Sequence, residues 1–368
     1  MKIALVSGSN VIHTIRWANA LVENGHEVHL VDCHNSASGL SPLVIQHKMK
    51  FAPPLGYFLN VPSLVKLLKN IAPDVVNVHY ASGYGTLARL AKVGKSFPYV
   101  LSLWGSDIYD FPSSSFIHKM LVRGNMLSAT SIASTSYCMA EQARKVLGDA
   151  SYFCEITPFG VESEKFAFKK RILSTDRPIV IGTVKRLMNK YGIDTLIESF
   201  YLLTKKDPSK DYRLILVGEG PQESHLKELV SSYGLAHCVE FRGACLHSDV
   251  PSVLDEFDVF AALSRLDSES FGVAIVEAAF AGVPVVVTEA DGPKEVVTTM
   301  RNGFVVRKEN PEEACNMLYE LINNHELYSQ FSLSGRQLGI ANYEWVKSVS
   351  IMESVYERTI KRFKSGGI

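Results

Sequence analysis

The sequence predicts an α/β protein with two doubly wound domains, each built around a parallel sheet. Three observations predict this class: the chain length, the alternation of strand-like with helix-like segments, and a charged segment near the middle. At 368 residues, the chain exceeds one ordinary hydrophobic core and fits two domains. Its 46% hydrophobic and 21% charged residues are typical of a soluble globular protein.

Apolar runs of strand length alternate with segments of helical periodicity, which is typical of βαβ units. In the first half we expect a helix at 15–24 and strands at 3–7, 27–31, 75–79 and 98–103. In the second half we expect helices at 195–203, 223–232 and from Val273, and strands at 179–182, 213–217, 239–242, 259–262 and 285–287. Each half is therefore expected to form its own parallel sheet.

The segment 165–177 is charged and poor in large apolar residues, so we interpret it as the linker. We place the first domain at residues 1–168 and the second at 169–344. From residue 345 to 368, helical spacing of apolar residues predicts a final helix.

Composition and charge argue against several classes of protein. The formal net charge is zero, with an excess of +3 in residues 1–165, so nucleic acid is not an expected partner. No run of about 18 uncharged apolar residues is present, and residues 1–8 are typical of a buried strand rather than a secretory signal. Six cysteines lack any Cys-x-x-Cys spacing. We expect a cytoplasmic protein whose thiols are reduced and mostly in the core.

Residues 268–278 form the most informative motif, because two carboxylates flank a glycine that opens an apolar helix. The free N–H groups of the first turn, at Gly272 and Val273, can bind phosphate. Glu269, in the preceding loop, can accept hydrogen bonds from sugar hydroxyls, and Glu277, about two turns further on, suits a ribose diol. The alternative is that one glutamate caps the helix and the other is simply exposed.

Residues 181–194 run from a strand into a loop that carries Lys185, Arg186 and Lys190. Clustered positive charges repel one another unless an anion joins them, and a diphosphate is such an anion. Arg186 can bind it with a planar fork and Lys190 as a point charge. The alternative is a set of solvated surface cations beside a turn.

In their order and separation these motifs resemble the retaining glycosyltransferases of family 4, and the resemblance extends from the first strand to Trp345. It implies the GT-B fold: two Rossmann-like domains facing a cleft, with a C-terminal helix, about 345–368, that crosses back to the first domain. It also implies further donor-site residues on the loops, namely Gly8, Gly218, Gly220, Gly243, Cys245 and Phe271.

The chain departs from the family pattern at two places. The family more often has a lysine directly before the glycine of the second motif, where this chain has Tyr191. Many members have a histidine near the reacting sugar where this chain has Trp104, and Asp107 is then the nearest polar candidate for a catalytic role. Capping of the next helix is the alternative for Asp107. His79 is a further candidate, with a structural role as its alternative.

The resemblance implies a metal-independent retaining glycosyltransferase of the hexosyl or N-acetylhexosaminyl class. The expected donor is a nucleotide-diphosphate sugar, with UDP favoured, and the expected acceptor is a hydroxyl of a saccharide or lipid-linked saccharide in surface polysaccharide or lipopolysaccharide biosynthesis. Arg186 and Lys190 would replace a divalent ion, and no Asp-x-Asp motif is present to bind one, so neither metal nor cofactor is expected. The alternatives are a sugar-nucleotide epimerase on the same fold and a non-catalytic nucleotide-sugar-binding protein.

Residues 116–127 form a basic amphipathic helix in the first domain. Such a helix can contact a bilayer that carries a lipid-linked acceptor, which would place the protein peripherally on the inner membrane face. The alternative is that the apolar stripe of this helix belongs to the core.

Overall fold

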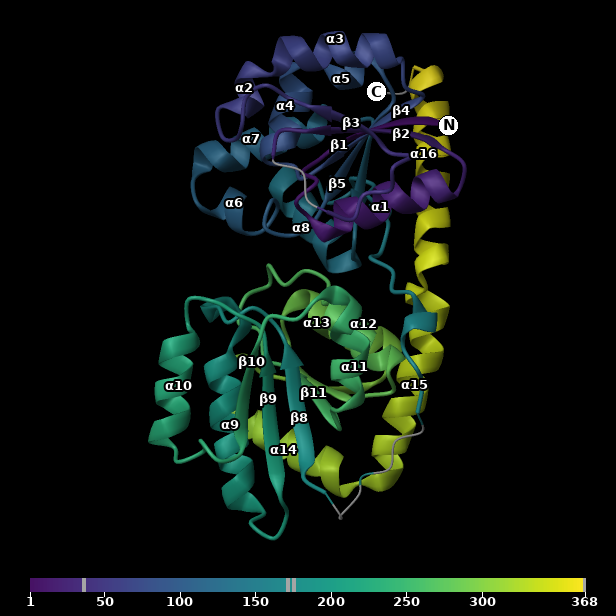
Figure 1. The fold of residues 1–368 in the computed structure, drawn as a ribbon. Coiled ribbons are helices and arrows are strands. Elements are labelled where there is room, and N and C mark those ends of the chain that lie inside the picture. Colours follow the sequence, from purple (N-terminus) through teal and green to yellow (C-terminus); the bar gives the residue numbers. More distant parts are fainter. Residues whose placement is uncertain (35–37, 170–172, 174–176, 367–368) are drawn as a thin grey trace. The chain divides into compact units, whose positions relative to one another are not determined.

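The computed structural model describes residues 1–34, 38–169, 173 and 177–366. The chain divides into two compact units, each with a parallel sheet covered by helices (Figure 1). The first unit contains Met1–Pro158 and Val346–Ile368, and the second contains Phe159–Trp345. The α/β class predicted from the sequence is confirmed.

The first unit has a seven-stranded sheet in the order β3-β2-β1-β4-β5-β6-β7. Its strands are β1 (Lys2–Val6), β2 (Glu27–Asp32), β3 (Ile45–Lys48), β4 (Val75–His79), β5 (Tyr99–Leu103), β6 (Ser131–Ser134) and β7 (Glu155–Ile156). The order reverses between β1 and β4, which is the topological switch point where doubly wound sheets bind ligands.

Helices cover both faces of this sheet, so its central strands are buried on both sides; β4 is buried along its whole length, including its polar residues Asn77 and His79. The helices are α1 (Ile12–Glu23), α2 (Gly56–Leu59), α3 (Val61–Ile71), α4 (Gly83–Leu90), α5 (Val93–Ser96), α6 (Asp110–Ser113), α7 (Phe116–Leu127), α8 (Tyr137–Leu147) and α16 (Trp345–Lys364).

The last helix, α16, packs into the first unit although it lies at the other end of the chain (Figure 1). Tyr356 is 1% exposed, and its hydroxyl donates to Asn77 Oδ1 at 2.9 Å. Arg358 pairs with Glu155 at 2.8 Å. Apolar burial together with these polar contacts explains why the helix belongs to this unit.

The second unit has a six-stranded sheet in the order β10-β9-β8-β11-β12-β13. The strands are β8 (Ile179–Val184), β9 (Tyr212–Val217), β10 (Val239–Gly243), β11 (Val259–Ala262), β12 (Val285–Thr288) and β13 (Gly303–Val306). The helices are α9 (Ile193–Lys206), α10 (Glu223–Ser232), α11 (Val250–Asp255), α12 (Val273–Phe280), α13 (Asp291–Met300), α14 (Pro311–Asn323) and α15 (His325–Tyr343). Three short 3₁₀ turns, Ser163–Lys165, Asn189–Tyr191 and His247–Asp249, connect them.

Residues 159–168 pack with the second unit, whereas the sequence analysis assigned them to the first domain. The reason is aromatic packing that a charge count does not reveal. Phe159 meets Phe271 edge-on with ring centroids 5.7 Å apart, and Phe166 meets Phe280 at 6.4 Å. The middle of the predicted linker, at 170–172 and 174–176, lies outside the described residues.

Helix α7 has the bounds expected from the sequence, but its apolar residues are divided between two sides. Val122 and Met126 are fully buried, while Phe116 and Ile117 are each 77% exposed and Met120 is 45% exposed. The alternative that the apolar stripe belongs to the core therefore holds for Val122 and Met126 and fails for Phe116, Ile117 and Met120. In the ranges that the structure describes, no helix is both long and apolar enough to cross a membrane.

The contact between Tyr356 and Asn77 gives a test of how α16 is held. We expect Tyr356→Phe to lower the free energy of unfolding by about 1 kcal/mol, because a buried acceptor loses one donor while the ring is kept. Urea unfolding followed by fluorescence measures the change. Tyr201→Phe is the control, since that half-exposed ring stacks on Tyr233 in the second unit. Equal midpoints for both variants and the wild type would show that the hydroxyl contributes nothing.

Candidate functional site

A pocket of about 560 Å³ lies at the carboxyl edge of the second unit's sheet. Residues that end or follow β8, β9 and β10 line it: Val184, Lys185, Arg186, Val217, Gly218, Glu219, Gly220, Ala244 and Cys245. Four residues selected from the sequence, Arg186, Gly218, Gly220 and Cys245, therefore meet in one pocket. This edge is where ligands bind in open parallel sheets.

Close packing of the backbone at Gly218 shapes the floor of the pocket. Gly218 has φ +143°, and a Cβ there would lie 1.9 Å from the carbonyl oxygen of Lys185. Its N–H donates to the carbonyl of Gly243 at 2.7 Å. Only glycine allows the ends of three strands to approach one another so closely. The glycine thus has a structural reason that is independent of any ligand.

Lys185 forms an ion pair with Glu269 at 2.5 Å, and the two side chains are only 11% and 12% exposed. Burial alone would lower the pKa of Lys185, but the charge of Glu269, with contributions from Tyr191 and Glu277, raises it overall. Lys185 was not selected from the sequence, because its partner lies 84 residues away. Glu269 was expected to be free for sugar hydroxyls. Instead Oε1 holds Lys185, and the remaining lone pairs can still accept hydrogen bonds.

Arg186 and Lys190 carry positive charge that no carboxylate in the described ranges pairs with. Arg186 is exposed at the rim, and among the described residues no carboxylate pairs with it. Lys190 Nζ lies 5.1 Å from the ring centroid of Tyr191, and Lys185 Nζ lies 5.3 Å from the same ring. A cation–π contact leaves ammonium hydrogens free to donate. The tyrosine that replaces the family lysine thus contacts two neighbouring ammonium groups.

Helix α12 begins as the motif predicted, with Gly272 in the left-handed region at φ +93° directly before Val273. Glu277 is 4% exposed, and its Oε1 lies 3.1 Å from His247 Nε2. Burial is the main cause of a raised pKa at Cys245, and the charges of Asp249 and, to a smaller extent, Glu277 add to it. Glu277 thus acts electrostatically on both Lys185 and Cys245. His247 is a site residue that sequence reasoning missed, although it stands only two positions after Cys245.

The ring of Phe271 belongs to the core of the second unit rather than to the pocket. It is 4% exposed and meets Phe159 and Tyr343 edge-on, at centroid distances of 5.7 Å and 5.4 Å. A contact between Phe271 and a ligand would therefore have to come from its backbone.

Asp107, in the first unit, has a structural explanation. The side chain is 1% exposed, and its carboxylate accepts hydrogen bonds from the N–H groups of Ala81, Trp104 and Gly105 at 2.7, 3.1 and 2.9 Å. Burial raises the pKa of this carboxyl, although these backbone hydrogen bonds act against it. Asp107 does not cap α6, whose N-cap residue is Tyr109. It joins the loops after β4 and β5, and we assign it no direct chemical role.

His79 is likewise structural. It is 1% exposed, and burial, with a smaller contribution from His13, lowers its pKa to about 3, so the ring is neutral. Nε2 lies 3.1 Å from Asn77 Oδ1 and Nδ1 lies 3.0 Å from Ser7 Oγ. Because Asn77 Oδ1 only accepts, Nε2 carries the proton. Trp104 packs on this ring at a centroid distance of 4.1 Å.

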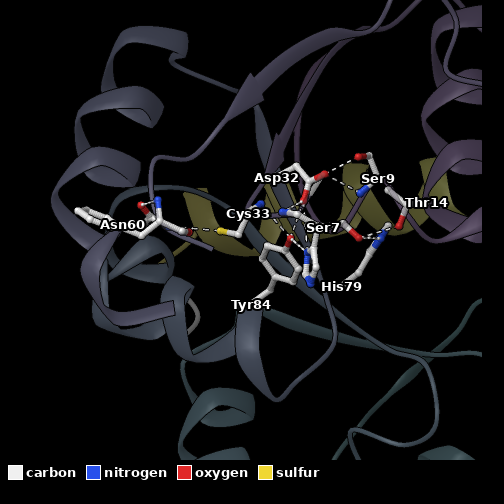
Figure 2. Close-up of polar contacts among 10 residues, drawn as sticks. Ser7, Ser9, Thr14, Asp32, Cys33, Asn60, His79 and Tyr84 are labelled. Carbon is white, nitrogen blue, oxygen red and sulfur yellow. Dashed lines mark hydrogen bonds and ion pairs between the residues drawn. The ribbon is translucent and has the colours of Figure 1, made fainter. Parts of the chain in front are cut away.

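Gly8 lies in the loop after β1, at the switch point of the first unit. Figure 2 shows the polar network beside it, centred on the buried carboxylate of Asp32. This carboxylate accepts from Ser9 N at 2.9 Å, from Ser9 Oγ, and from the Tyr84 hydroxyl at 2.8 Å. Gly8 itself lines a smaller pocket together with Tyr84. The sequence thus selected residues in two units, and each set lies at the carboxyl edge of its own sheet.

Among the residues with described positions, no group of three or more His, Cys, Asp and Glu side chains forms a candidate metal site. The six cysteines are all free; Cys33, Cys154 and Cys315 are buried and the others are partly exposed.

Comparison with known proteins identifies the family. Residues 164–338 match the glycosyl transferases group 1, and residues 2–136 match the glycosyl transferase 4-like family. The chain belongs to the group 1, family 4 glycosyltransferases. This glycosyltransferase is 23% identical, over 99% of its length and 97% of the relative's, to N-acetyl-alpha-D-glucosaminyl L-malate synthase of Bacillus anthracis. It is 26% identical to an uncharacterised glycosyltransferase of Methanocaldococcus jannaschii, over 85% of this chain and 83% of that one.

Solved structures share the GT-B fold of this glycosyltransferase at low sequence identity. Sucrose-phosphate synthase of Thermosynechococcus elongatus matches with a TM-score of 0.82 and 18% identity, over 97% of this chain and 98% of that one. Anabaena HepE, solved in complex with UDP, matches with a TM-score of 0.80 and 18% identity, over 97% and 100%. The fold predicted from the sequence is confirmed.

The ion pair of Lys185 with Glu269 can be tested by substitution. We expect Lys185→Met to cost about 3–5 kcal/mol of unfolding free energy, because it leaves a nearly buried carboxylate without its partner. Adding Glu269→Gln should recover part of this loss, since the unpaired charge disappears. Urea unfolding measures both.

Lys227→Met is the matched control, because Lys227 pairs with Glu223 in an exposed contact. This variant should lose less than about 1 kcal/mol of unfolding free energy.

The pKa of Lys185 is raised in the folded state. Its contribution to stability should therefore be complete below the ordinary lysine pKa of about 10.4, and should be lost only as pH rises through the higher folded value. If Lys185→Met lowers the unfolding free energy no more than Lys227→Met does, the burial of the Lys185–Glu269 pair does not make its loss more costly.

Proposed function

We propose that this glycosyltransferase transfers a hexosyl or N-acetylhexosaminyl group from a UDP-sugar to a hydroxyl of a saccharide or lipid-linked saccharide, with retention of anomeric configuration. The pocket of the second unit supports this donor site, because its rim has an exposed Arg186 that no described carboxylate pairs with. A nucleotide diphosphate supplies the anion that this charge lacks. The UDP complex of the HepE structure supports the choice of nucleotide.

In this proposal the protein stabilises the leaving diphosphate without a metal ion. Arg186 forms a planar, bidentate contact and Lys190 a point-charge contact with the phosphates. The first N–H groups of α12, after Gly272, bind a further phosphate oxygen. Charge develops on the diphosphate as the glycosidic bond breaks, so donors fixed there lower the barrier. Glu277 binds the ribose diol, and His247 orients its carboxylate.

The chemical step exchanges one bond at the anomeric carbon. The bond from this carbon to the phosphate oxygen breaks, and a bond to the acceptor oxygen forms on the same face. The acceptor proton passes to the departing phosphate oxygen, so no protein base is needed. This scheme does not require Asp107, whose buried carboxylate is already hydrogen-bonded to the backbone.

The donor site is tested with UDP-, GDP- and ADP-sugars in EDTA, by thermal shift and nucleotide release. We expect UDP-sugars to stabilise the wild type, and Arg186→Ala to weaken their binding about 10- to 100-fold through loss of charge-assisted hydrogen bonds. Glu277→Gln should weaken binding by a smaller factor, because an amide still accepts one hydroxyl. Lys227→Ala, on α10 and outside the pocket, is the control.

Three outcomes would contradict the proposal. A failure of every donor to bind, with or without magnesium, would exclude a nucleotide-sugar site. Binding of a donor without transfer to any acceptor would favour a non-catalytic binding protein. Conversion of the sugar without net release of UDP would favour an epimerase. The anomeric configuration of a transfer product, read by nuclear magnetic resonance, tests retention separately.

We further propose that α7 contacts the surface of an anionic bilayer, which would bring the protein to lipid-linked acceptors. Phe116 and Ile117 are each 77% exposed at the start of this helix, and Lys119 lies exposed beside them. Large apolar side chains next to a cation are the pattern of interfacial helices. One turn later, Arg123 Nε donates a hydrogen bond to the carbonyl of Leu147. Lys119 is therefore the cation of this part of α7 that is better placed to contact lipid headgroups.

Vesicle sedimentation tests this contact. We expect binding to vesicles rich in phosphatidylglycerol, weakened at high salt, and little binding to phosphatidylcholine. Replacing Phe116 and Ile117 together with serine should reduce binding at least tenfold, because each buried apolar side chain contributes about 1.5–3 kcal/mol. Leu333→Ser, at a 49% exposed position of the second unit, is the control. Unchanged binding of the double variant would exclude α7 as the contact.

A further inference from the structure

The cationic loop of the second unit follows β8 and contains residues 185–191, among them three basic side chains, Lys185, Arg186 and Lys190. Neighbouring positive charges repel one another, so contacts with other segments must keep this loop in one conformation. The backbone after β9 holds its first half, because Leu187 N donates to the carbonyl of Glu219 at 3.0 Å. The second half, which contains Lys190, is held by a different segment.

The loop after β11 supports this second half along the backbone. Arg265 N donates to the carbonyl of Lys190 at 2.8 Å. Two positions after this lysine, Gly192 has φ +59°, and a Cβ there would lie 2.0 Å from the carbonyl oxygen of Leu263. A glycine is required at this position, because the two segments approach too closely for a side chain. The end of the cationic loop is thus held against residues 263–265.

The side chain of Arg265 binds the chain on both sides of Lys190. Nη1 donates to the carbonyl of Asn189 at 3.1 Å and also to the side-chain oxygen of that residue. Nη2 donates to Asp194 Oδ2 at 2.6 Å. Asn189 directly precedes Lys190 and Asp194 stands four positions after it, so one planar group fixes the backbone around this lysine. Charge-assisted hydrogen bonds of this kind are about twice as strong as neutral ones.

The nitrogens of Arg265 are already occupied by acceptors of the protein. Its Nε lies 3.1 Å from Glu309 Oε1, so a second carboxylate joins Asp194 in neutralising the guanidinium, which is only 17% exposed. Arg186 differs, because it is exposed and no carboxylate in the described part of the chain pairs with it. Arg186 is therefore suited to bind an anion, whereas Arg265 is suited to hold the segment beside it.

The loop that carries Arg265 is anchored at further points. Asp267 pairs with Lys308, which follows β13, at 2.5 Å. Glu269 pairs with Lys185, at the start of the cationic loop. The loop after β11 therefore contacts the cationic loop at both of its ends, through Glu269 at the start and through Arg265 at the end. Charges that are held in place in this way need not be reoriented when an anion binds.

We propose that Arg265 is a positioning residue for the diphosphate of the donor: it fixes the cationic loop so that Lys190 reaches the phosphates, and it makes no contact with the ligand itself. The proposal rests on the proposed donor site and adds a residue to the support of that site. It requires the planar fork of arginine, because the single ammonium of a lysine cannot bind Asn189 and Asp194 in the same geometry.

The experiment is a double-mutant cycle on the full chain, measured by calorimetric titration with UDP in EDTA. We expect Arg265→Met and Lys190→Met each to weaken UDP about tenfold, as the loss of a hydrogen bond to a charged group does. If Arg265 acts through Lys190, the double variant should also be only about tenfold weaker, because a displaced lysine and an absent one contribute equally little. Two independent contacts would instead give about a hundredfold loss.

Three further measurements separate positioning from charge and from general distortion. Arg265→Lys keeps the charge but loses the fork, so it should still weaken UDP about fivefold or more. Arg307→Met is the matched control, since it removes an arginine that follows β13 and pairs with Glu313 in an exposed contact; it should weaken UDP less than about twofold. Uridine has no phosphate, so Arg265→Met should leave its binding unchanged in saturation-transfer nuclear magnetic resonance.

An additive double variant, full recovery in Arg265→Lys, or weakened binding of uridine would each overturn the proposal. If Arg265→Met does not fold, Asn189→Ala replaces it in the cycle, because it removes one acceptor of the guanidinium and keeps both ion pairs; we then expect a loss of about threefold that is absent beside Lys190→Met.

Failure of the proposed function has a different result. If the wild type binds no nucleotide, the proposed donor site is wrong, and the same cycle is run with inorganic diphosphate, which needs only the cationic loop. Binding of diphosphate that is weakened equally by Arg265→Met, by Lys190→Met and by both together would still support the role of Arg265. No binding of diphosphate would overturn this proposal as well.

Discussion

Charge that is withdrawn from water at the edge of a sheet must be paired, and this constraint determines what each unit can bind. In the second unit Lys185 neutralises Glu269, so Arg186 remains as positive charge without a described carboxylate partner. In the first unit hydroxyl and N–H donors satisfy Asp32, and three backbone N–H groups satisfy Asp107. The pocket of the second unit therefore presents Arg186 beside Glu219, whereas the described lining of the first unit's pocket contains neither lysine nor arginine, although both pockets lie at the carboxyl edge of a similar parallel sheet.

Much of the fold could be predicted from the sequence, because buried parallel strands are short apolar runs. The expected strands at 75–79 and 259–262 and the helix at 223–232 have the bounds found in the structure. The pattern fails where burial is low or the element is short: β3 is largely exposed and polar, and β7 has two residues. The aromatic rings of residues 159–168 were missed for another reason, since packing partners more than a hundred residues away leave no local signal.

The candidate donor site was predictable in its members but not in their contacts. Arg186 was selected as one of several clustered cations in a loop after a strand, and Gly218, Gly220 and Cys245 were selected through the resemblance to the family. The pairing of Lys185 with Glu269, and of His247 with Glu277, could not be predicted, because these residues follow different strands of the sheet and are brought together only by the order of those strands. Trp104 shows the converse: a departure from the family pattern that appeared to remove chemistry instead contributes a ring that packs on a neutral histidine.

The C-terminal helix is connected to the loop of Gly8 by a chain of buried hydrogen bonds. Tyr356 and His79 Nε2 both donate to Asn77 Oδ1; His79 Nδ1 then accepts from Ser7, whose hydroxyl lies 2.7 Å from that of Thr14 on α1. Every member is fixed in its donor or acceptor role, because a neutral His79 can carry only one ring proton. Tyr356 stands 279 positions after Asn77 in the chain. Its helix thereby supports the turn that lines the pocket of the first unit. The C-terminal helix is thus part of the support of the loop that carries Gly8.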